Sequence, residues 1–194
     1  MSPLSGLCSI SSGYSLRTGV GSDGEAGTPV VQLRDVDWET GRIDWTALPA
    51  VDGIEPDEDR YLRAGAVLFS GKGQAHQAVL VSEDHRALAV SPFFVVRPER
   101  DDVEPAYVAW YLNAAPAQAH IHRCAVGATI RSVSKTCLSS LPVPLPPLDV
   151  QHQIAGAVRL AAEERALAAD LADRKARLVE TACLRSLHLH SSMP

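Results

Sequence analysis

The chain has 194 residues, of which 46% are apolar, and it carries a formal net charge of −5. This apolar content is enough for the core of one domain plus an appendage. No apolar run approaches the roughly 20 residues that a membrane-spanning helix needs. The first residues lack the basic and apolar regions of a secretory signal, so we expect a cytoplasmic protein that does not bind a membrane.

Charge is unevenly distributed along the chain. Residues 1–59 carry 3 basic and 11 acidic side chains, residues 60–137 carry 9 and 6, and residues 138–194 carry 6 of each. The middle segment is therefore net positive, whereas the first is strongly negative. Whole-chain charge favours an ordinary acidic soluble domain, but a local basic patch can still bind phosphate.

Short β-branched and aromatic runs, bounded by Gly, Pro, Asp or Ser turns, predict strands in the first half of the chain. These runs are Val30–Leu33, Ala66–Ser70, Gln77–Val81, Leu88–Val90 and Phe93–Arg97. Acidic residues followed by Pro105 predict a helix over Asp101–Asn113. A second short helical turn is expected from Pro116 to Arg123. Closely spaced strands without alternating long helices predict an irregular α+β domain.

The pattern changes near Pro147. Ser134 is expected to cap a helical turn over Lys135–Leu141, since a serine oxygen can accept an unpaired helix N–H. The next segment, Val143–Pro147, cannot be helical, because each proline fixes its own φ and disfavours helical geometry in the preceding residue. Asp149 is expected to cap one long helix. A rigid segment before a long helix is suited to holding a domain at a fixed distance.

The long helix, predicted from Val150 to about Leu187, would measure about 55 Å at its usual rise. Its leucines recur at steps of seven, four and seven residues, as on a coiled-coil seam: Leu160, Leu167, Leu171 and Leu178. We expect this seam to form a dimer interface with a partner helix. The alternative is a helix that folds back on its own domain.

Several patterns resemble catalytic or metal sites without completing them. Gly19–Gly24 matches a dinucleotide-binding fingerprint by letter, but Glu25–Pro29 cannot open the helix that would receive a pyrophosphate. His120–Cys124 offers three zinc ligands, yet on one helical turn they point to different sides, which favours a solvated helix end. The four cysteines form no Cys-x-x-Cys pair and are expected to be reduced. We expect a binding protein with no catalytic residues, metal or cofactor.

The segment SVSKTCLSSLPVPLPPLDVQHQIA, residues 132–155, resembles the junction in DNA specificity subunits of type I restriction–modification systems. It combines Ser-Lys, a leucine, Pro-x-Pro-Pro-Leu, an acidic residue, Gln and Ile in that order. Further segments similar to these subunits are Cys8–Arg17, Tyr61–Leu62, Ala66–Gly73, Ser91–Pro98, Tyr107–Asn113 and Gly127–Lys135. The resemblance covers nearly the whole chain, and it implies a non-catalytic subunit that reads DNA.

The usual member of that family has two recognition domains and two helical regions, whereas this chain has one of each. The resemblance therefore implies a half-subunit that forms a homodimer through its C-terminal helix and reads two inverted half-sites. From the change in pattern near Pro147, we expect a target-recognition domain (1–147), a spacer and dimerisation helix (148–190) and a disordered tail (191–194). The implied partners are double-stranded DNA, a methyltransferase subunit and a restriction or motor subunit. The alternative is an assembly module that uses its helix without reading DNA sequence.

A half-site reader needs donors for base edges and cations for phosphates. Glycine-flanked loops suit this task, because they let the backbone approach a duplex closely. The expected DNA-binding residues lie mainly on or beside such loops: Tyr14, Arg17, Arg34, Ser70, Lys72, Gln74, Thr129, Arg131 and Lys135. Lys72 is expected to contact phosphate and Arg131 a guanine. For each residue, an ordinary solvated surface position is the alternative.

Overall fold

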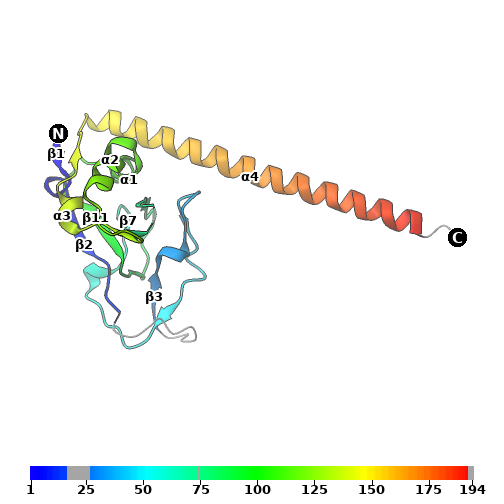
Figure 1. Ribbon diagram of the computed structural model, residues 1–194, viewed down its shortest axis with the longest axis horizontal. Helices are drawn as coiled ribbons and strands as arrows, with labels where there is room; N and C mark the ends of the chain where they lie inside the picture. The colour runs from blue at the N-terminus through cyan, green and yellow to red at the C-terminus, as the bar shows by residue number, and fades with distance from the viewer. Residues whose placement is uncertain (17–26, 74, 192–194) are drawn as a thin grey trace. The chain divides into compact units, whose positions relative to one another are not determined.

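The computed structural model describes residues 1–16, 27–73 and 75–191, with side chains described as far as residue 185. The chain divides into two compact units, Met1–Ala155 and Gly156–Pro194. Figure 1 traces their helices and strands along the chain. Arg17 and Gln74, two of the expected DNA-binding residues, lie outside the described residues, as do residues 192–194 of the expected tail.

A four-stranded antiparallel sheet lies at the centre of the first unit, in the order β2-β11-β7-β9. Its strands are β2 (Cys8–Ser12), β11 (Phe93–Pro98), β7 (Val67–Ser70) and β9 (Ala78–Leu80). Successive side chains of a strand point to opposite faces. In β7, Val67 and Phe69 join one apolar cluster while Leu68 joins another. The sheet is therefore buried on both faces, which explains why its central strands are continuously apolar.

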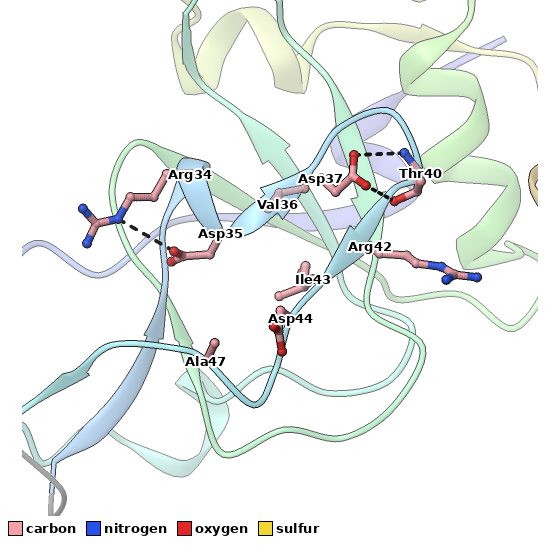
Figure 2. A pocket seen from close by; sticks show the side chains of 9 residues that line it. All are labelled: Arg34, Asp35, Val36, Asp37, Thr40, Arg42, Ile43, Asp44 and Ala47. Carbon is pink, nitrogen blue, oxygen red and sulfur yellow. Dashed lines mark hydrogen bonds and ion pairs between the residues drawn. The ribbon is translucent and has the colours of Figure 1, made fainter. Parts of the chain in front are cut away.

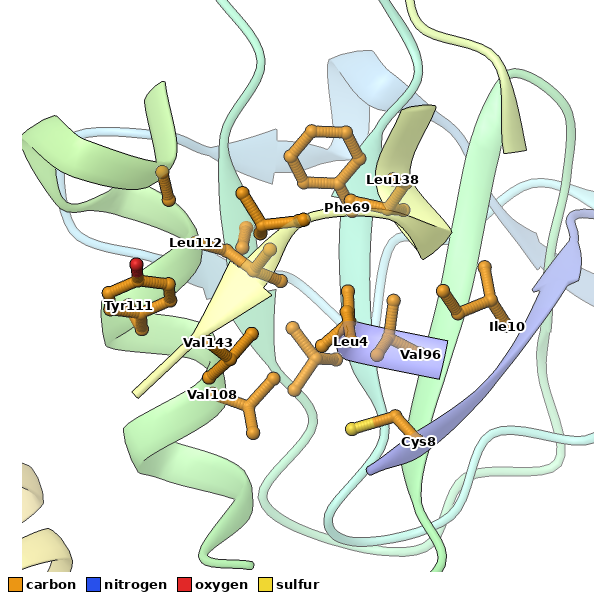
Figure 3. Packing of buried hydrophobic residues seen from close by; sticks show 14 of the residues in the cluster. Leu4, Cys8, Ile10, Phe69, Val96, Val108, Tyr111, Leu112, Leu138 and Val143 are labelled. Atoms are coloured by element: carbon orange, nitrogen blue, oxygen red, sulfur yellow. The ribbon is translucent and has the colours of Figure 1, made fainter. Parts of the chain in front are cut away.

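The larger cluster lies between this sheet and three helices: α1 (Pro105–Asn113), α2 (Ala115–Cys124) and α3 (Lys135–Ser139). Figure 3 shows Phe69 and Val96 of the sheet in this cluster with Leu112 of α1 and Leu138 of α3. The three expected helical segments are confirmed. The first begins at Pro105 and not at Asp101, because the Glu104 carboxylate accepts the Ala106 N–H and caps the helix there.

Smaller sheets and turns complete the first unit. In a three-stranded sheet, β3 (Thr28–Val31) lies between the parallel β10 (Leu88–Ala89) and the antiparallel β6 (Ala50–Val51). The remaining short elements are the pair β1 (Ser2–Pro3) and β13 (Pro142–Val143), the hairpin β4 (Val36–Asp37) and β5 (Arg42–Ile43), and the 3-10 turns η1 (Leu4–Gly6), η2 (Leu33–Asp35) and η3 (Glu58–Arg60). All five expected strands are present, with ends shifted by two residues or fewer. The α+β class is confirmed.

The proline segment after α3 is held against α1 by two tyrosines. Tyr107 and Tyr111 lie one helical turn apart in α1. The Tyr107 hydroxyl donates to the Pro144 carbonyl at 2.8 Å, and the Tyr111 hydroxyl donates to the Pro142 carbonyl at 2.9 Å. The prediction that this segment is not helical is confirmed. Two side chains of α1 therefore hold the proline segment through its backbone carbonyls.

The long helix α4 covers Leu148–Ser191, which is 44 residues or about 66 Å at a rise of 1.5 Å per residue. Asp149 lies in its first turn and is not the cap that was expected. The Pro147 carbonyl already accepts the Val150 and Gln151 N–H groups at 3.0 and 3.1 Å, so the helix starts earlier. No helix among the described residues, α4 included, is both long and apolar enough to cross a membrane.

Gln151 anchors the first turn of α4 inside the first unit. Its side chain is fully buried, and its Oε1 accepts the Glu104 N–H at 3.0 Å. Its Nε2 donates to the carbonyls of Asp102 at 2.9 Å and Pro146 at 2.8 Å. One buried amide thus bonds to three backbone groups from two segments of the chain.

The cysteines differ from expectation. Cys124 of α2 and Cys137 of α3 form a disulfide, whereas all four cysteines were expected to be reduced thiols. The two lie 13 residues apart in sequence and come together because both helices pack into the same cluster. Cys8 is a buried thiol and Cys183 an exposed one. Sequence spacing gave no sign of the pair, because the contact is tertiary.

Candidate nucleic-acid interface

The two glycine-flanked loops that were expected to bind DNA lie side by side. β8 (Lys72–Gly73) pairs antiparallel with β12 (Arg131–Ser132), and Ser132 lies opposite Lys72. The Val133 N–H extends this ladder by donating to the Gly71 carbonyl at 2.9 Å. We call Lys72–Gly73 together with residues 126–132 the β8–β12 ribbon. It joins segments that are about 60 residues apart in sequence.

Two glycines allow the ribbon to take this form. Gly73 has a φ of +134° and Gly127 a φ of +119°, a region that residues with a Cβ rarely adopt. A Cβ at Gly127 would also collide with the Ile130 carbonyl. Val126 and Ser132 exchange backbone hydrogen bonds of 3.0 and 2.8 Å, which close the turn between them. Thr129 lies in this turn and is exposed.

The ribbon belongs to a part of the sequence that lacks acidic residues. Residues 105–148 contain Arg123, Arg131 and Lys135 and no Asp or Glu, and residues 64–82 contain Lys72 and no Asp or Glu. All four cations are exposed. With no carboxylate in either segment, both segments are net positive although the whole chain is acidic.

The Arg131 guanidinium lies near the end of one helix, and Lys135 begins another. The Arg131 Nη2 donates to the His122 carbonyl at 3.2 Å, near the C-terminus of α2, where a cation is favoured. A guanidinium has five N–H donors, so others can still bind a base or phosphate. Lys135 is the first residue of α3, and the Ser134 Oγ accepts the Cys137 N–H at 3.1 Å. The predicted serine cap is confirmed.

Two exposed apolar side chains of the ribbon were not among the expected residues. Val126 is 70% exposed and Ile130 is 65% exposed, in the same turn as Thr129. Apolar side chains at a DNA surface can contact a thymine methyl group. The sequence could have indicated these two residues, because they lie near Gly127 and belong to no periodic apolar pattern that predicts a buried strand or helix.

Other expected DNA-binding residues have different surroundings. Ser70 is buried, and its hydroxyl donates to the Lys72 carbonyl at 2.9 Å. It therefore supports the backbone of the ribbon and does not face solvent as expected. Tyr14 is half-buried against the cluster that contains Val90, and it forms a parallel bridge with that residue. Neither side chain belongs to the ribbon surface.

Arg34 lines a separate hollow of about 570 Å³ beside η2 and the β4–β5 hairpin (Figure 2). The charged residues of this hollow are two arginines and three aspartates: Arg34, Arg42, Asp35, Asp37 and Asp44. A hydrogen bond from the Thr40 hydroxyl lowers the pKa of Asp37, and one from Thr46 lowers the pKa of Asp44. Three carboxylates outweigh two guanidinium groups, so the hollow is a poorer phosphate site than the ribbon.

The segment from His120 to Cys124 is more than the solvated helix end that was expected. His122 and Arg123 are exposed, but His120 and Cys124 are half-buried. With Cys137 they form a group of three ligand atoms that lie within 4.8 Å of one another. It is the only such group among residues 1–16, 27–73 and 75–185. The local sequence pattern could not reveal this group, because the third side chain comes from α3.

Comparison with known proteins identifies related folds. The family model for the type I restriction modification DNA specificity domain matches residues 26–158. Among solved structures, the chain is similar to the HsdS subunit from Thermoanaerobacter tengcongensis, with a TM-score of 0.59 and 21% identity over 86% of this chain and 38% of that one. No curated protein matches the chain.

Two further structures are similar. One comes from a study of complex assembly and conformational transition of the type I R-M system; it has a TM-score of 0.66 and 22% identity over 92% of this chain and 42% of that one. The other is the type I restriction–modification S subunit from M. genitalium, with a TM-score of 0.56 and 14% identity over 84% and 38%. The chain thus spans about two fifths of the length of these proteins, and the likeness is one of fold.

Proposed function

Because this chain belongs to the type I restriction modification DNA specificity domain family, we propose that its first unit binds double-stranded DNA and recognises a short half-site through the β8–β12 ribbon. The observation that carries this proposal is the pairing of β8 with β12. This pairing places the exposed residues Lys72 and Arg131 on neighbouring strands. The two segments that contain these strands have no Asp or Glu.

We propose different roles for the ribbon residues and for Lys135, the first residue of α3. Lys72 and Lys135 bind phosphates, because an ammonium group is a compact charge without a fixed planar geometry. Arg131 binds the O6 and N7 atoms of a guanine, because its planar fork matches that pair of acceptors. Thr129 contributes a hydroxyl to a neighbouring base or phosphate. Val126 and Ile130, which are largely exposed, contact apolar parts of the duplex.

We propose that α4 is a spacer and a dimer interface. Leu160, Leu167, Leu171 and Leu178 are 58%, 71%, 52% and 70% exposed. Leucines at coiled-coil spacing are removed from water when a second helix covers them. In an antiparallel pair of α4 helices, the two recognition units are attached to opposite ends. That arrangement suits two inverted half-sites with a fixed spacer.

We propose that the dimer docks a methyltransferase subunit and a restriction or motor subunit. Support comes from the family and from the study of complex assembly in a type I R-M system that yielded one of the similar structures. In this assembly the chain itself supplies no catalytic residue. The competing candidate, an assembly module without DNA reading, is favoured by the exposed leucines alone.

An electrophoretic mobility shift with the methyltransferase subunit present tests the proposal. DNA selected from a random pool by the wild-type complex is compared with unselected DNA. We expect the selected DNA to be retained at protein concentrations that leave random DNA free. The double variant Lys72→Ala with Arg131→Ala should lose this preference.

A matched double variant, Lys175→Ala with Arg177→Ala, removes two exposed cations from α4 and should keep the preference. Circular dichroism establishes that each variant is folded. Equal binding of selected and random DNA by the wild-type complex would contradict DNA reading. If the chain still assembles with the methyltransferase subunit but binds selected and random DNA equally, the assembly module is favoured.

A further inference from the structure

A cluster of three metal-ligating side chains lies between α2 and α3. His120 and Cys124 are one turn apart in α2, and Cys137 lies in α3. One ring nitrogen of His120 and the two sulfur atoms lie within 4.8 Å of one another. We propose that, when Cys124 and Cys137 are reduced, this cluster binds one Zn²⁺ ion.

The donor set selects the metal. Two thiolates and one imidazole suit Zn²⁺, whereas Mg²⁺ and Ca²⁺ prefer carboxylate and carbonyl oxygens. Residues 105–148 contain no Asp or Glu, so no carboxylate of this segment can join the cluster. Three protein ligands leave the fourth tetrahedral position for water.

The backbone positions fit both the disulfide and the metal site. The Cα atoms of Cys124 and Cys137 are 6.0 Å apart. Tetrahedral zinc with Zn–S bonds of about 2.3 Å holds two sulfurs about 3.8 Å apart, which side-chain rotation at this Cα separation can reach. The disulfide and the metal site are therefore alternative states of one pair. Zinc binding to the reduced pair releases the two thiol protons.

No strong hydrogen bond occupies the Nε2 atom of His120 in the part of the chain that the structure describes. Its Nε2 makes two long contacts, to the Cys137 carbonyl at 3.4 Å and to the Ser140 hydroxyl at 3.5 Å. Both exceed the usual range of protein hydrogen bonds. A neutral imidazole at this position can therefore direct a lone pair to a metal without giving up a strong hydrogen bond.

The position of the cluster relates it to the ribbon. Cys124 precedes residues 125–136 and Cys137 follows them, and this segment contains β12 and Arg131. A zinc ion would hold both ends of the segment, as the disulfide does, when the thiols are reduced. The competing interpretation is a disulfide with a histidine that lies beside it by chance. In that case the reduced chain binds no metal.

Metal titration of the full chain tests the proposal without DNA. The chain, without an added polyhistidine segment, is reduced and titrated with Co²⁺ and then Zn²⁺ in the absence of oxygen. We expect one Co²⁺ per chain, with thiolate-to-cobalt charge-transfer absorption and the visible bands of a tetrahedral ion, and displacement by Zn²⁺. Cys124→Ser, Cys137→Ser and His120→Ala should each lose the bound metal.

Matched controls separate this site from other thiols and imidazoles. Cys183→Ser removes an exposed thiol and His122→Ala an exposed imidazole, and both variants should bind like the wild type. His120→Cys should restore the binding that His120→Ala loses, and this pair remains decisive if the cysteine variants do not fold. Absence of the cobalt bands in the reduced wild type, or unchanged binding by His120→Ala, would overturn the proposal.

Discussion

Single side chains divide the proposed DNA contact into two kinds of interaction. A lysine on phosphate contributes to every sequence alike and is sensitive to salt. An arginine on a base edge contributes to one sequence and distinguishes it from others. Lys72 and Arg131 lie on paired strands, so the same ribbon provides both kinds of group.

Substitution of the two cations should give different signatures. Lys72→Ala is expected to weaken binding to all sequences and to reduce the slope of log affinity against log salt by about one. Arg131→Ala is expected to cost about 1–3 kcal/mol on the selected sequence and to relax preference at one base pair. Fluorescence anisotropy at several salt concentrations measures both. Arg34→Ala, at an exposed arginine beside Asp35, is the control and should change neither.

Gln151→Ala should destabilise the first unit. It leaves the Glu104 N–H and the carbonyls of Asp102 and Pro146 without their partner, and a buried unpaired polar group costs about 1–3 kcal/mol. Urea unfolding should therefore show a loss of that order or more. Gln153→Ala, an exposed glutamine two residues later, is the control. Equal midpoints for the two variants would contradict the anchoring role of Gln151.

Cys8 should resist alkylation in the folded chain. Burial, assisted by the nearby Glu99 carboxylate, raises the pKa of its thiol from 9.0 to about 12. Since the folded-state pKa is raised, the associated stability is fully present below pH 9 and is lost as the pH rises toward 12. Mass spectrometry after iodoacetamide treatment at pH 8 should find Cys183 modified and Cys8 unmodified. Both should react in urea, and rapid folded-state modification of Cys8 would contradict its burial.

At the scale of whole elements, α4 has a seam of exposed leucines. Its leucines from Leu160 to Leu178 are at least half exposed. Exposed ion pairs at four-residue spacing, Arg159 with Glu163 and Arg174 with Asp170, add little stability to the helix. Removal of the leucines from water by a second helix would contribute considerably more.

Charges placed in this seam should separate the chains. Leu167→Asp with Leu171→Asp puts two carboxylates into the proposed interface at a cost of several kcal/mol. Light scattering should report a dimer for the wild type and a monomer for this variant. Ala169→Asp with Ala176→Asp adds the same charge on the opposite side of the helix and should stay dimeric. A seam variant that keeps the dimer mass would refute the interface.

The elements differ in how well the sequence predicts them. Ala66–Ser70 and Phe93–Arg97 could be predicted as strands, because long apolar runs must be buried wherever they pair. β8 and β12 have two residues each, too few for any period, and their pairing depends on a segment about 60 residues away. Ser70 is a second example. Its position at the end of an apolar strand could be predicted from the sequence. Its burial and its hydrogen bond to the Lys72 carbonyl could not, because they depend on neighbouring strands.

At the scale of the whole molecule, charge is concentrated by segment. The segments that form the ribbon lack carboxylates, while residues 1–59 hold 11 of the 23 acidic side chains. Repulsion between this acidic part and a phosphate backbone would favour docking through the ribbon. One ribbon provides few phosphate contacts, so a single unit is expected to bind DNA weakly, and two linked units are needed for tight binding.

The last prediction concerns the spacing of half-sites. A dimer joined through rigid helices should bind DNA with two inverted half-sites more tightly than DNA with one, by up to about 10²–10⁴-fold when the spacing matches. Insertion of about 5 base pairs between the half-sites rotates one to the opposite face of the duplex, since a turn is about 10.5 base pairs. The advantage should then disappear.

Titrations of the three DNAs with wild type and with the Leu167→Asp, Leu171→Asp variant measure this effect. The variant should bind all three DNAs with the affinity of a single recognition unit. Its ribbon is unchanged, but its dimer interface is disrupted. A wild-type dimer that binds one-site and two-site DNA equally would mean that the paired helices do not hold the two ribbons on one duplex. The length of α4 would then serve subunit docking, and spacing would be set elsewhere in the complex.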